Sequence, residues 1–551
     1  MYNFTPMDKT INTVDLIIII VYLFGILLIG ILSTRLTKMT SERYFLAGRG
    51  LNWILVGTAL FASNISTIHL VGLAASGYNE GLVWGNFEWL AAVSLIMLGL
   101  IFAPFYFKSR ISTLPEFLEK RYDSRSRTVM AIIAIIGALF VHIGMSLYAG
   151  AVVFKSFFGI NVITSIILIS VITTIYTVLG GLKAVVITET IQSVILIAGA
   201  FILTGFGIYA LKDHGIYSVA ELKANLKPGQ LQILHTKESL KQLGGDNGLT
   251  WYACLLGYPV LGLWYWCSDQ TIVQRVLGAR SQKDAQLGPI LAGFLKILPV
   301  FILVFPGIIA YVLFRDIIGT DANMALPTLI NELLPVGLKG IMAATLLAAL
   351  MSTIAAALNS SATLVAVDIV KRINPNVSDR KQIRIGRLAA VGVMLLAIVW
   401  STQGGKFSSI FEAINKIASA IAPPVAAVFL MGVFSKKGTA QAAFITLISG
   451  LILGISAFCI DFEPISGYMY LTKGFGIPFM MQAWWLFVIC IGIYFSVSYF
   501  TEKPPVEVIE KYTWESPIAV LVRDKFSGIK DIRLWAAILF LTLVVLYAIF
   551  R

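Results

Sequence analysis

Long apolar runs, separated by short polar stretches, make up most of the chain. A helix needs about 20 consecutive apolar residues to cross the hydrocarbon core of a bilayer. Fourteen runs fit: 14–34, 51–78, 82–107, 128–154, 161–180, 184–211, 249–271, 286–314, 336–370, 388–402, 407–434, 438–460, 481–500 and 534–550. The longest polar stretches, 212–248 and 501–533, are loops rather than domains. The pattern predicts an all-α polytopic membrane protein with 14 transmembrane helices.

Composition and charge agree with a membrane protein. Hydrophobic residues make up 58% of the 551 residues and charged residues 13%, whereas a soluble protein has about 25% charged residues. The net charge of +13 would suggest nucleic acid in a soluble protein. Here 28 of the 42 lysines and arginines lie in the loops that follow odd-numbered spans, and only 12 lie on the other side. The positive-inside rule therefore places both termini outside.

The apolar composition and the basic loops also predict where the protein is located. We expect its apolar surface to contact the lipid bilayer, and we expect no nucleic acid as a partner. The compact loops and short termini suggest a bacterial inner membrane, which makes both termini periplasmic.

A few ionisable residues lie within the predicted spans, where each is costly unless it faces a wet cavity or a partner. Glu88 and Lys296 have no charged neighbour close by in the sequence, so we predict a functional role for both. Glu412 and Lys416 are four residues apart and would neutralise each other on one helix face. For Glu189, near the cytoplasmic boundary, a solvated carboxylate and a functional one both remain open.

Two spans carry signs of a break. The second holds the polar run from Ser63 to His69, and the seventh holds Gly257, Pro259 and Gly262 at similar depth. Paired interruptions of this kind indicate a transporter built from inverted repeats, with freed carbonyls around a central site. The predicted units are an extra N-terminal helix at 1–35, a first five-helix repeat at 51–211, an inverted second repeat at 249–434, and three extra helices at 438–551.

Hydroxyl side chains in the ninth span add a second element to this site. Ser352 and Thr353 lie in mid-span. Such residues often only join helices together, but hydroxyls combined with carbonyls from an unwound helix would also suit Na⁺, a small hard cation. The break around Ala62 and Ile65 would supply those carbonyls.

Several ordered motifs make the chain similar to a known family. They are Tyr44-Phe45-Leu46-Ala47-Gly48-Arg49, Ala62-Ser63-Asn64-Ile65-Ser66, Gly180-Gly181-Leu182-Lys183-Ala184-Val185, Trp264-Tyr265-Trp266-Cys267-Ser268-Asp269-Gln270 with Val273-Gln274-Arg275, and Ala422-Pro423-Pro424-Val425-Ala426-Ala427-Val428-Phe429. Together they resemble the sodium:solute symporter family, in its sodium/glucose cotransporter branch, from about residue 14 to 450. The resemblance implies the inverted five-plus-five fold and alternating access.

The resemblance also implies roles for residues. The co-transported sodium ion would be held by the carbonyls of Ala62, Ile65 and Ala349 and the hydroxyls of Ser352 and Thr353. The sugar would contact Asn64, His69, Glu88, Tyr265, Trp266 and Lys296, with Asn415 nearby. Leu73, Phe87 and Phe411 would form an outer hydrophobic lid, and Glu189 would lie on a sodium path. The predicted substrate is a hexose such as glucose or galactose; the alternative is myo-inositol or another organic solute such as a sugar acid.

Three departures from the family pattern affect these expectations. Asn415 stands where sugar transporters usually carry glutamine, and Gly262 stands where some members have a polar contact residue. Ala355 and Ala356 replace the two hydroxyls, and Glu189 the aspartate, of members that couple two sodium ions. We therefore predict one sodium per substrate.

An enzyme is not expected. The four histidines do not cluster in the sequence, and no HxxxH, CxxC or GxSxG arrangement appears.

Overall fold

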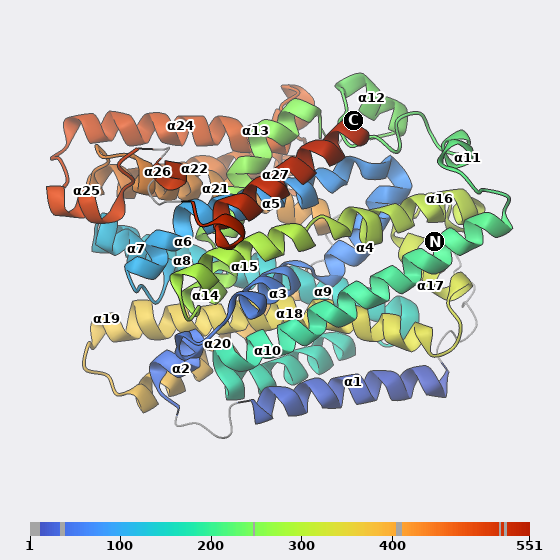
Figure 1. Cartoon of the computed structure of the whole chain (residues 1–551), viewed down its shortest axis with the longest axis horizontal. Helices are drawn as coiled ribbons and strands as arrows, with labels where there is room; N and C mark the ends of the chain where they lie inside the picture. The colour runs from blue at the N-terminus through green and yellow to red at the C-terminus, as the bar shows by residue number, and fades with distance from the viewer. Residues whose placement is uncertain (1–11, 34–38, 246–247, 404–409, 517–518, 523–525) are drawn as a thin grey trace.

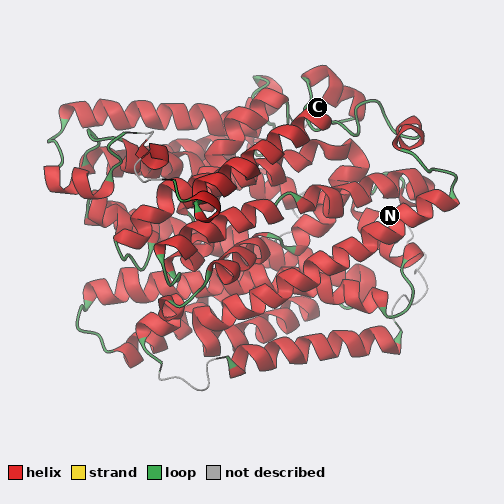
Figure 2. Cartoon of the chain, in the orientation of Figure 1, coloured by secondary structure: helices red, strands yellow, loops and turns green. Residues whose placement is uncertain are grey.

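Helices run side by side along the long axis of the molecule (Figure 1). This computed structural model describes residues 12–33, 39–245, 248–403, 410–516, 519–522 and 526–551. Within those residues every regular element is helical and no strand occurs (Figure 2). Eleven of the described helices are long and apolar enough to cross a membrane. The predicted all-α class is confirmed.

The helices of the N-terminal half cover the first predicted repeat. They are α1 (Thr13–Leu32), α2 (Ser41–Leu46), α3 (Trp53–Asn64), α4 (Thr67–Glu80), α5 (Gly85–Met97), α6 (Ala103–Lys108), α7 (Leu114–Arg121), α8 (Ser124–Gly137), α9 (Met145–Phe158) and α10 (Val162–Asp213). A π-helical segment, η4 (Ala138–Gly144), joins α8 to α9.

The C-terminal half begins with two short loop helices, α11 (Val219–Ala224) and α12 (Lys237–Leu243). The longer helices that follow are α13 (Trp251–Gly262), α14 (Gln270–Leu277), α15 (Gln282–Leu295), α16 (Phe305–Ile318), α17 (Ala325–Leu333), α18 (Leu338–Thr363), α20 (Asp379–Ser401), α21 (Ile410–Phe434), α22 (Ala440–Asp461), α24 (Phe479–Phe500) and α27 (Ile532–Ile549). Short helices α19 (Lys371–Ile373), α25 (Val506–Tyr512) and others lie between them.

The 52-residue α10 is two helices joined at a glycine. Gly181 has φ 62° and ψ −163°, a conformation that costs a residue with a Cβ atom far more than glycine. A Cβ atom there would also lie 2.5 Å from the carbonyl oxygen of Tyr44. The chain therefore changes direction at the Gly180–Gly181 motif, between the fifth and sixth predicted spans.

The break predicted in the second span is present. Helix α3 ends at Asn64, Ile65 is extended with ψ 105°, and α4 starts at Thr67. Ser66 and His69 form a capping box that satisfies the free amides at the start of α4. The polar run is thus the cap of the second half-helix.

The break in the seventh span lies further along than predicted. Helix α13 continues through Pro259, a π-helical segment, η5 (Leu263–Ser268), follows, and Asp269 is extended with ψ 123° before α14 begins. Placing the break at Gly257–Gly262 was wrong. Those glycines serve close packing instead, since a Cβ atom at Gly257 would lie 2.3 Å from the carbonyl oxygen of Met480, and one at Gly262 would lie 2.2 Å from Ser94 Oγ.

Burial separates central from peripheral helices. In the span that contains α18, 94% of the most apolar stretch is buried, against 28% for α1 and 17% for α27. The outer helices carry exposed large apolar side chains, such as Phe24 and Val545. Large exposed apolar faces are the surface expected for contact with lipid tails.

The connecting segments gather at two ends of the molecule. Helices α2, α7, α19 and α25 lie at the left of Figure 1, and α11 and α12 lie at the right, where α1 begins and α27 ends. The left-hand segments include basic loops that the sequence assigns to the cytoplasmic side.

Candidate functional site

A cavity of about 810 Å³ lies between the helices of the two predicted repeats. All seven residues predicted to bind substrate line it: Asn64, His69, Glu88, Tyr265, Trp266, Lys296 and Asn415. They come from α3, α4, α5, η5, the end of α15 and α21, so distant parts of the chain meet at one site.

The polar centre of the cavity is a network around Lys296. This residue caps the C-terminus of α15, and its Nζ donates 2.6 Å to Asn64 Oδ1 and is ion-paired with Glu88 Oε2. The Asn64 amide donates to the Tyr265 hydroxyl at 3.1 Å. Glu88 and Lys296, which lack a local partner in the sequence, are therefore each other's partner, and both side chains are almost completely buried.

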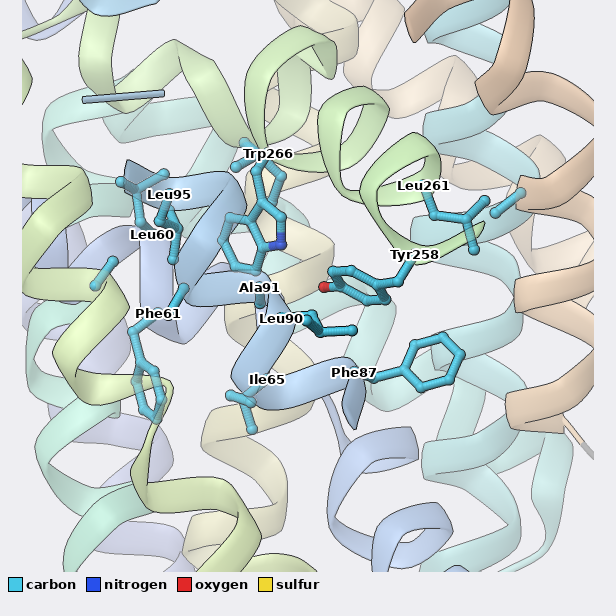
Figure 3. Packing of buried hydrophobic residues seen from close by; sticks show 14 of the residues in the cluster. Leu60, Phe61, Ile65, Phe87, Leu90, Ala91, Leu95, Tyr258, Leu261 and Trp266 are labelled. Atoms are coloured by element: carbon cyan, nitrogen blue, oxygen red, sulfur yellow. The ribbon is translucent and has the colours of Figure 1, made fainter. Parts of the chain in front are cut away.

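Aromatic rings form one wall of the site. The ring centroids of Tyr265 and Trp266 are 5.1 Å apart, and Lys296 Nζ lies 5.7 Å from the centroid of Trp266. Figure 3 shows the Tyr258 hydroxyl and the Trp266 indole nitrogen pointing toward one another. Flat apolar faces beside hydrogen-bonding groups suit a ring-shaped polyol, because such a ring has an apolar face and a polar edge.

The three residues predicted for the outer lid do not all line the cavity in the described structure. Phe87 lines the cavity, with its ring stacked 5.3 Å from Trp84 and edge-on to Tyr258 at 5.4 Å. Leu73 is fully buried on α4 and is not a lining residue. The side chain of Phe411 lies outside the described residues, as does that of Glu412, so the predicted pair with Lys416 lies there too.

The predicted sodium ligands converge where α18 crosses the end of α3. Ser352 Oγ donates to the carbonyl oxygens of Ala62 at 2.8 Å and Ala349 at 3.0 Å. Thr353 Oγ1 donates to those of Ser63 at 3.1 Å and Ala349 at 3.3 Å. In the described structure Ile65 is not an acceptor of either hydroxyl, and Ser63, which the sequence did not single out, takes a place in the cluster.

This cluster has the donor set that a sodium ion needs. It offers neutral oxygen atoms from carbonyls freed by a helix break and from two hydroxyls, which suits a hard cation. It also adjoins the substrate cavity, because Thr353 lines the cavity and Asn64 follows Ser63 directly in the chain.

Glu189 is buried rather than solvated. Its carboxylate is ion-paired with Arg275 of α14 at 2.5 Å, and neither side chain is exposed. The alternative of a solvated carboxylate was wrong, because Arg275 of α14 lies against Glu189 in the interior of the protein. A role on a sodium path stays a prediction.

The sequence reasoning missed one pair in the cavity wall. His142 of η4 lines the cavity, and its Nε2 lies 2.7 Å from Asp269 Oδ2 at the second break. Both residues are buried. Asp269 falls inside the predicted seventh span and His142 inside the fourth. The rule that an ionisable residue in a span marks a functional site would have found both.

Two departures from the family pattern have a structural basis. Gly262 is held by its close approach to Ser94, which leaves no room for a side chain. Ala355 and Ala356 are completely buried in α18, where they offer no hydroxyl.

The comparison with known families agrees with this geometry. A profile of the sodium:solute symporter family matches residues 44–450. The chain belongs to the sodium:solute symporter family. It is therefore a sodium-coupled solute symporter, and sodium is the ion that it couples to.

Curated members of this family are similar over most of their length. Sodium/glucose cotransporter 2 of Rattus norvegicus is 36% identical over 486 residues, which cover 82% of this chain and 72% of that protein. Sodium/glucose cotransporter 1 of Ovis aries is 33% identical over 540 residues, covering 91% and 80%. Sodium/myo-inositol cotransporter 2 of Mus musculus is 33% identical over 546 residues, covering 92% and 80%.

Solved structures of other transporters share the fold. A Na⁺-coupled sialic acid symporter, in a substrate-bound outward-open state, has a TM-score of 0.76 at 20% identity, covering 89% of this chain and 99% of that one. A transporter of the nucleobase-cation-symport-1 family has a TM-score of 0.54 at 12% identity, covering 86% and 99%. This member of the sodium:solute symporter family thus has the helical fold of cation-coupled transporters.

Proposed function

We propose that this symporter couples inward flow of sodium to the uptake of a neutral sugar, a hexose such as glucose or galactose, by alternating access. The observation that carries the proposal is the junction of two sites. A cavity with the Lys296–Glu88 pair and an aromatic wall adjoins a cluster of carbonyl and hydroxyl oxygens at the first helix break. One site suits a polyol, and the other suits sodium.

The charges of the cavity favour a neutral substrate over a sugar acid. Among the described lining residues, Lys296 is the one lysine or arginine, and it is already paired with Glu88. A substrate carboxylate would have to compete with Glu88 for that lysine in a buried site, where an uncompensated charge is costly. Hydroxyl groups, by contrast, can accept from Lys296 and donate to Glu88 at the same time.

The same cavity would also fit myo-inositol, and this is the second candidate. A relative named as a sodium/myo-inositol cotransporter is as similar to this chain as a relative named as a sodium/glucose cotransporter, both at 33% identity. Asn415 has a shorter side chain than the glutamine expected there, and it lines the cavity. The choice between hexose and inositol therefore rests on the reach of a few side chains.

Coupling would act through the first break. A ligand shifts a conformational equilibrium by its difference in affinity between two states. Sodium between α18 and the carbonyls at the end of α3 would hold Ser352 and Thr353 against Ala62 and Ser63. That would fix the backbone next to Asn64, whose side chain reaches Lys296. Sodium would thus complete the substrate site.

One sodium per sugar is the proposed ratio, since Ala355 and Ala356 cannot contribute to a second hydroxyl site. A single sodium ion that enters down a tenfold gradient and a potential of 100 mV supports about 500-fold accumulation. A reversal-potential measurement in proteoliposomes gives the ratio directly. A ratio of two would contradict the proposal.

The proposed topology has fourteen crossings. Eleven long apolar helices account for eleven crossings. Counting α10 as two crossings, divided at Gly181, adds one. Counting α3–α4 and α13–α14 as one broken crossing each adds two more. The proposed repeats are 51–211 and 249–434, flanked by the helix at 1–35 and the three at 438–551. We place the protein in a bacterial inner membrane with both termini periplasmic, as the basic loops favour.

Uptake by purified protein in liposomes tests the substrate. Labelled glucose, galactose, myo-inositol and sialic acid are offered with an inward sodium gradient and with potassium in its place. Sodium-dependent accumulation of a hexose is expected. Accumulation of sialic acid alone would contradict the argument from the paired lysine.

A further inference from the structure

A buried tryptophan joins the two helices that carry Glu88 and Lys296. Trp89 follows Glu88 on α5, is fully buried, and is not a described lining residue of the cavity. Successive residues of a helix point about 100° apart, so Glu88 faces the cavity while Trp89 lies behind it. The indole Nε1 donates to the carbonyl oxygen of Ile297 at 3.3 Å, and Ile297 directly follows Lys296. This bond therefore links the backbone on the two sides of the ion pair.

The final helix, α27, packs against the Trp89 ring. The ring centroid of Trp89 lies 5.3 Å from that of Tyr547 and 5.8 Å from that of Phe550, both edge-on. Leu539 of α27 packs on the backbone of α15, because a Cβ atom at Gly293 would lie 2.5 Å from its side chain. Helix α27 thus contacts both α5 and α15 (Figure 1), although it lies outside the two proposed repeats.

A set of hydrogen bonds around Asn86 holds the start of α5. The Tyr547 hydroxyl donates to Asn86 Oδ1 at 3.0 Å, and the Asn86 amide donates to the carbonyl oxygen of Ile233 at 2.6 Å. The backbone amide of Ile233 in turn donates to the carbonyl oxygen of Phe550 at 2.7 Å. The last turn of α27 and the loop between α11 and α12 therefore fix the turn of α5 that carries Glu88.

We propose that Trp89 is a positioning residue for the substrate site, and that the last turn of α27 holds its ring in place. Glu88 and Lys296 come from separate helices, so their geometry depends on how firmly those helices are joined. A binding constellation keeps its geometry when packing and hydrogen bonds behind it fix the backbone. The inference rests on the proposed function, because it takes Glu88 and Lys296 as solute ligands. It gives a helix outside the repeats a part in solute binding without contact with the solute.

Replacing the indole tests the bond to Ile297. Trp89→Phe keeps an aromatic ring against Tyr547 but removes the N–H donor. The KM for solute uptake should rise about fivefold, since one hydrogen bond corresponds to about two- to tenfold in affinity. The sodium concentration for half-maximal uptake, measured at saturating solute, should stay within about twofold of wild type. An unchanged solute KM would overturn the role of Trp89.

Trp514→Phe is the matched control for this substitution. The buried Trp514 indole donates to the carbonyl oxygen of Ile101 at 3.2 Å, and neither residue is a described lining residue of the cavity. Its loss should lower the midpoint of thermal unfolding about as much as Trp89→Phe does, while the solute KM stays at the wild-type value. An equal rise in KM in both variants would mean that the effect of Trp89 is a general loss of stability.

A double-mutant cycle separates positioning from a structural role. A residue that acts only through the Glu88–Lys296 pair has little left to act on in Glu88→Gln, so the two effects are not additive. Adding Trp89→Phe to Glu88→Gln should change kcat/KM for uptake by less than about twofold. A further fivefold fall would show that Trp89 acts independently of the pair and would overturn the proposal.

Substitutions in α27 test the support of the ring. Tyr547→Ala removes both the ring beside Trp89 and the hydroxyl bound to Asn86, and should raise the solute KM about fivefold. Tyr547→Phe keeps the ring and should raise it about twofold. Trp535→Ala is the control on the same helix, since this ring packs against Phe294 near the other end of α27. A wild-type KM in both Tyr547 variants would overturn the role of α27.

The outcomes separate this inference from the proposed function. Wild-type uptake is measured first, and the series uses the hexose or inositol that the wild type takes up with sodium. If it takes up neither, both proposals fail. If uptake is normal and Glu88→Gln lowers it, but Trp89→Phe behaves like wild type, only the role of Trp89 is overturned.

Discussion

The backbone groups left free at the two helix breaks have different hydrogen-bond partners. At the first, the carbonyls of Ala62 and Ser63 accept the hydroxyls of Ser352 and Thr353, two short side chains on another helix. At the second, the carbonyl of Cys267 accepts the hydroxyl of Tyr106 at 2.7 Å, and Asp269 caps the next helix while bonded to His142. At the first break a cation can bind between the carbonyls once the hydroxyls of Ser352 and Thr353 rotate. At the second break the space is filled by the phenol ring of Tyr106 and by the Asp269–His142 pair.

This difference supports the proposal of one sodium ion per substrate. At the first break the freed carbonyls accept hydroxyls from another helix, whereas at the second break the Ser268 hydroxyl is bonded to carbonyls of its own π-helical segment. The second break instead holds an imidazole that faces the solute cavity. We therefore expect the two breaks to differ in function, with the first as the proposed sodium site.

The largest effect is expected at the first break. Ser352→Ala combined with Thr353→Ala removes both hydroxyl ligands, and sodium-dependent uptake should fall to the level of protein-free liposomes. Ser361→Ala is the control, since this buried hydroxyl on α18 donates to the carbonyl of Ala357 in its own helix. Uptake by the double variant at the wild-type rate would refute the assignment of the sodium site.

A smaller loss is expected from the ion pair in the cavity. Glu88→Gln leaves Lys296 buried without its counter-charge and removes an acceptor for sugar hydroxyls, so kcat/KM for uptake should fall about 100-fold, or about 2.7 kcal/mol. Glu119→Gln removes the carboxylate of another pair, with Arg127, away from the cavity. That variant should keep the wild-type KM; an equal loss in both would mean that Glu88 acts on folding alone.

Substitution at Gly262 tests whether glycine near the second break serves packing. In Gly262→Ala the new methyl group would lie 2.2 Å from Ser94 Oγ, and overpacking of this kind costs about 1–3 kcal/mol. The midpoint of thermal unfolding in detergent should fall, and adding Ser94→Ala should recover part of it. No recovery would argue that Gly262 is needed for backbone freedom.

The smallest effect is expected at Tyr106. Tyr106→Phe removes one hydrogen bond to a carbonyl at the second break, and such a bond contributes about 0.5–1.5 kcal/mol to stability. Thermal stability should decrease slightly, and the sodium concentration for half-maximal uptake should stay the same. A marked change in that concentration would place a sodium ion at the second break as well.

Much of this protein could be predicted from residue order alone. Apolar runs of membrane length predict the helical spans, and alternating basic loops predict which side of the membrane each loop faces. Two isolated ionisable residues predict a central site. The first break was also readable, because its cap, Ser66 with His69, is local in sequence. Features within one helix turn leave a signal in the sequence because their partners lie a few residues away.

Only the tertiary structure decided the rest. It paired Glu88 with Lys296, placed Glu189 against Arg275, and put the second break at Asp269 rather than at Gly257–Gly262. It also brought His142 to Asp269, which lie on different helices. The physical reason is shared: a buried charge or a glycine can be explained only by what packs against it, and those contacts come from helices that the sequence keeps far apart.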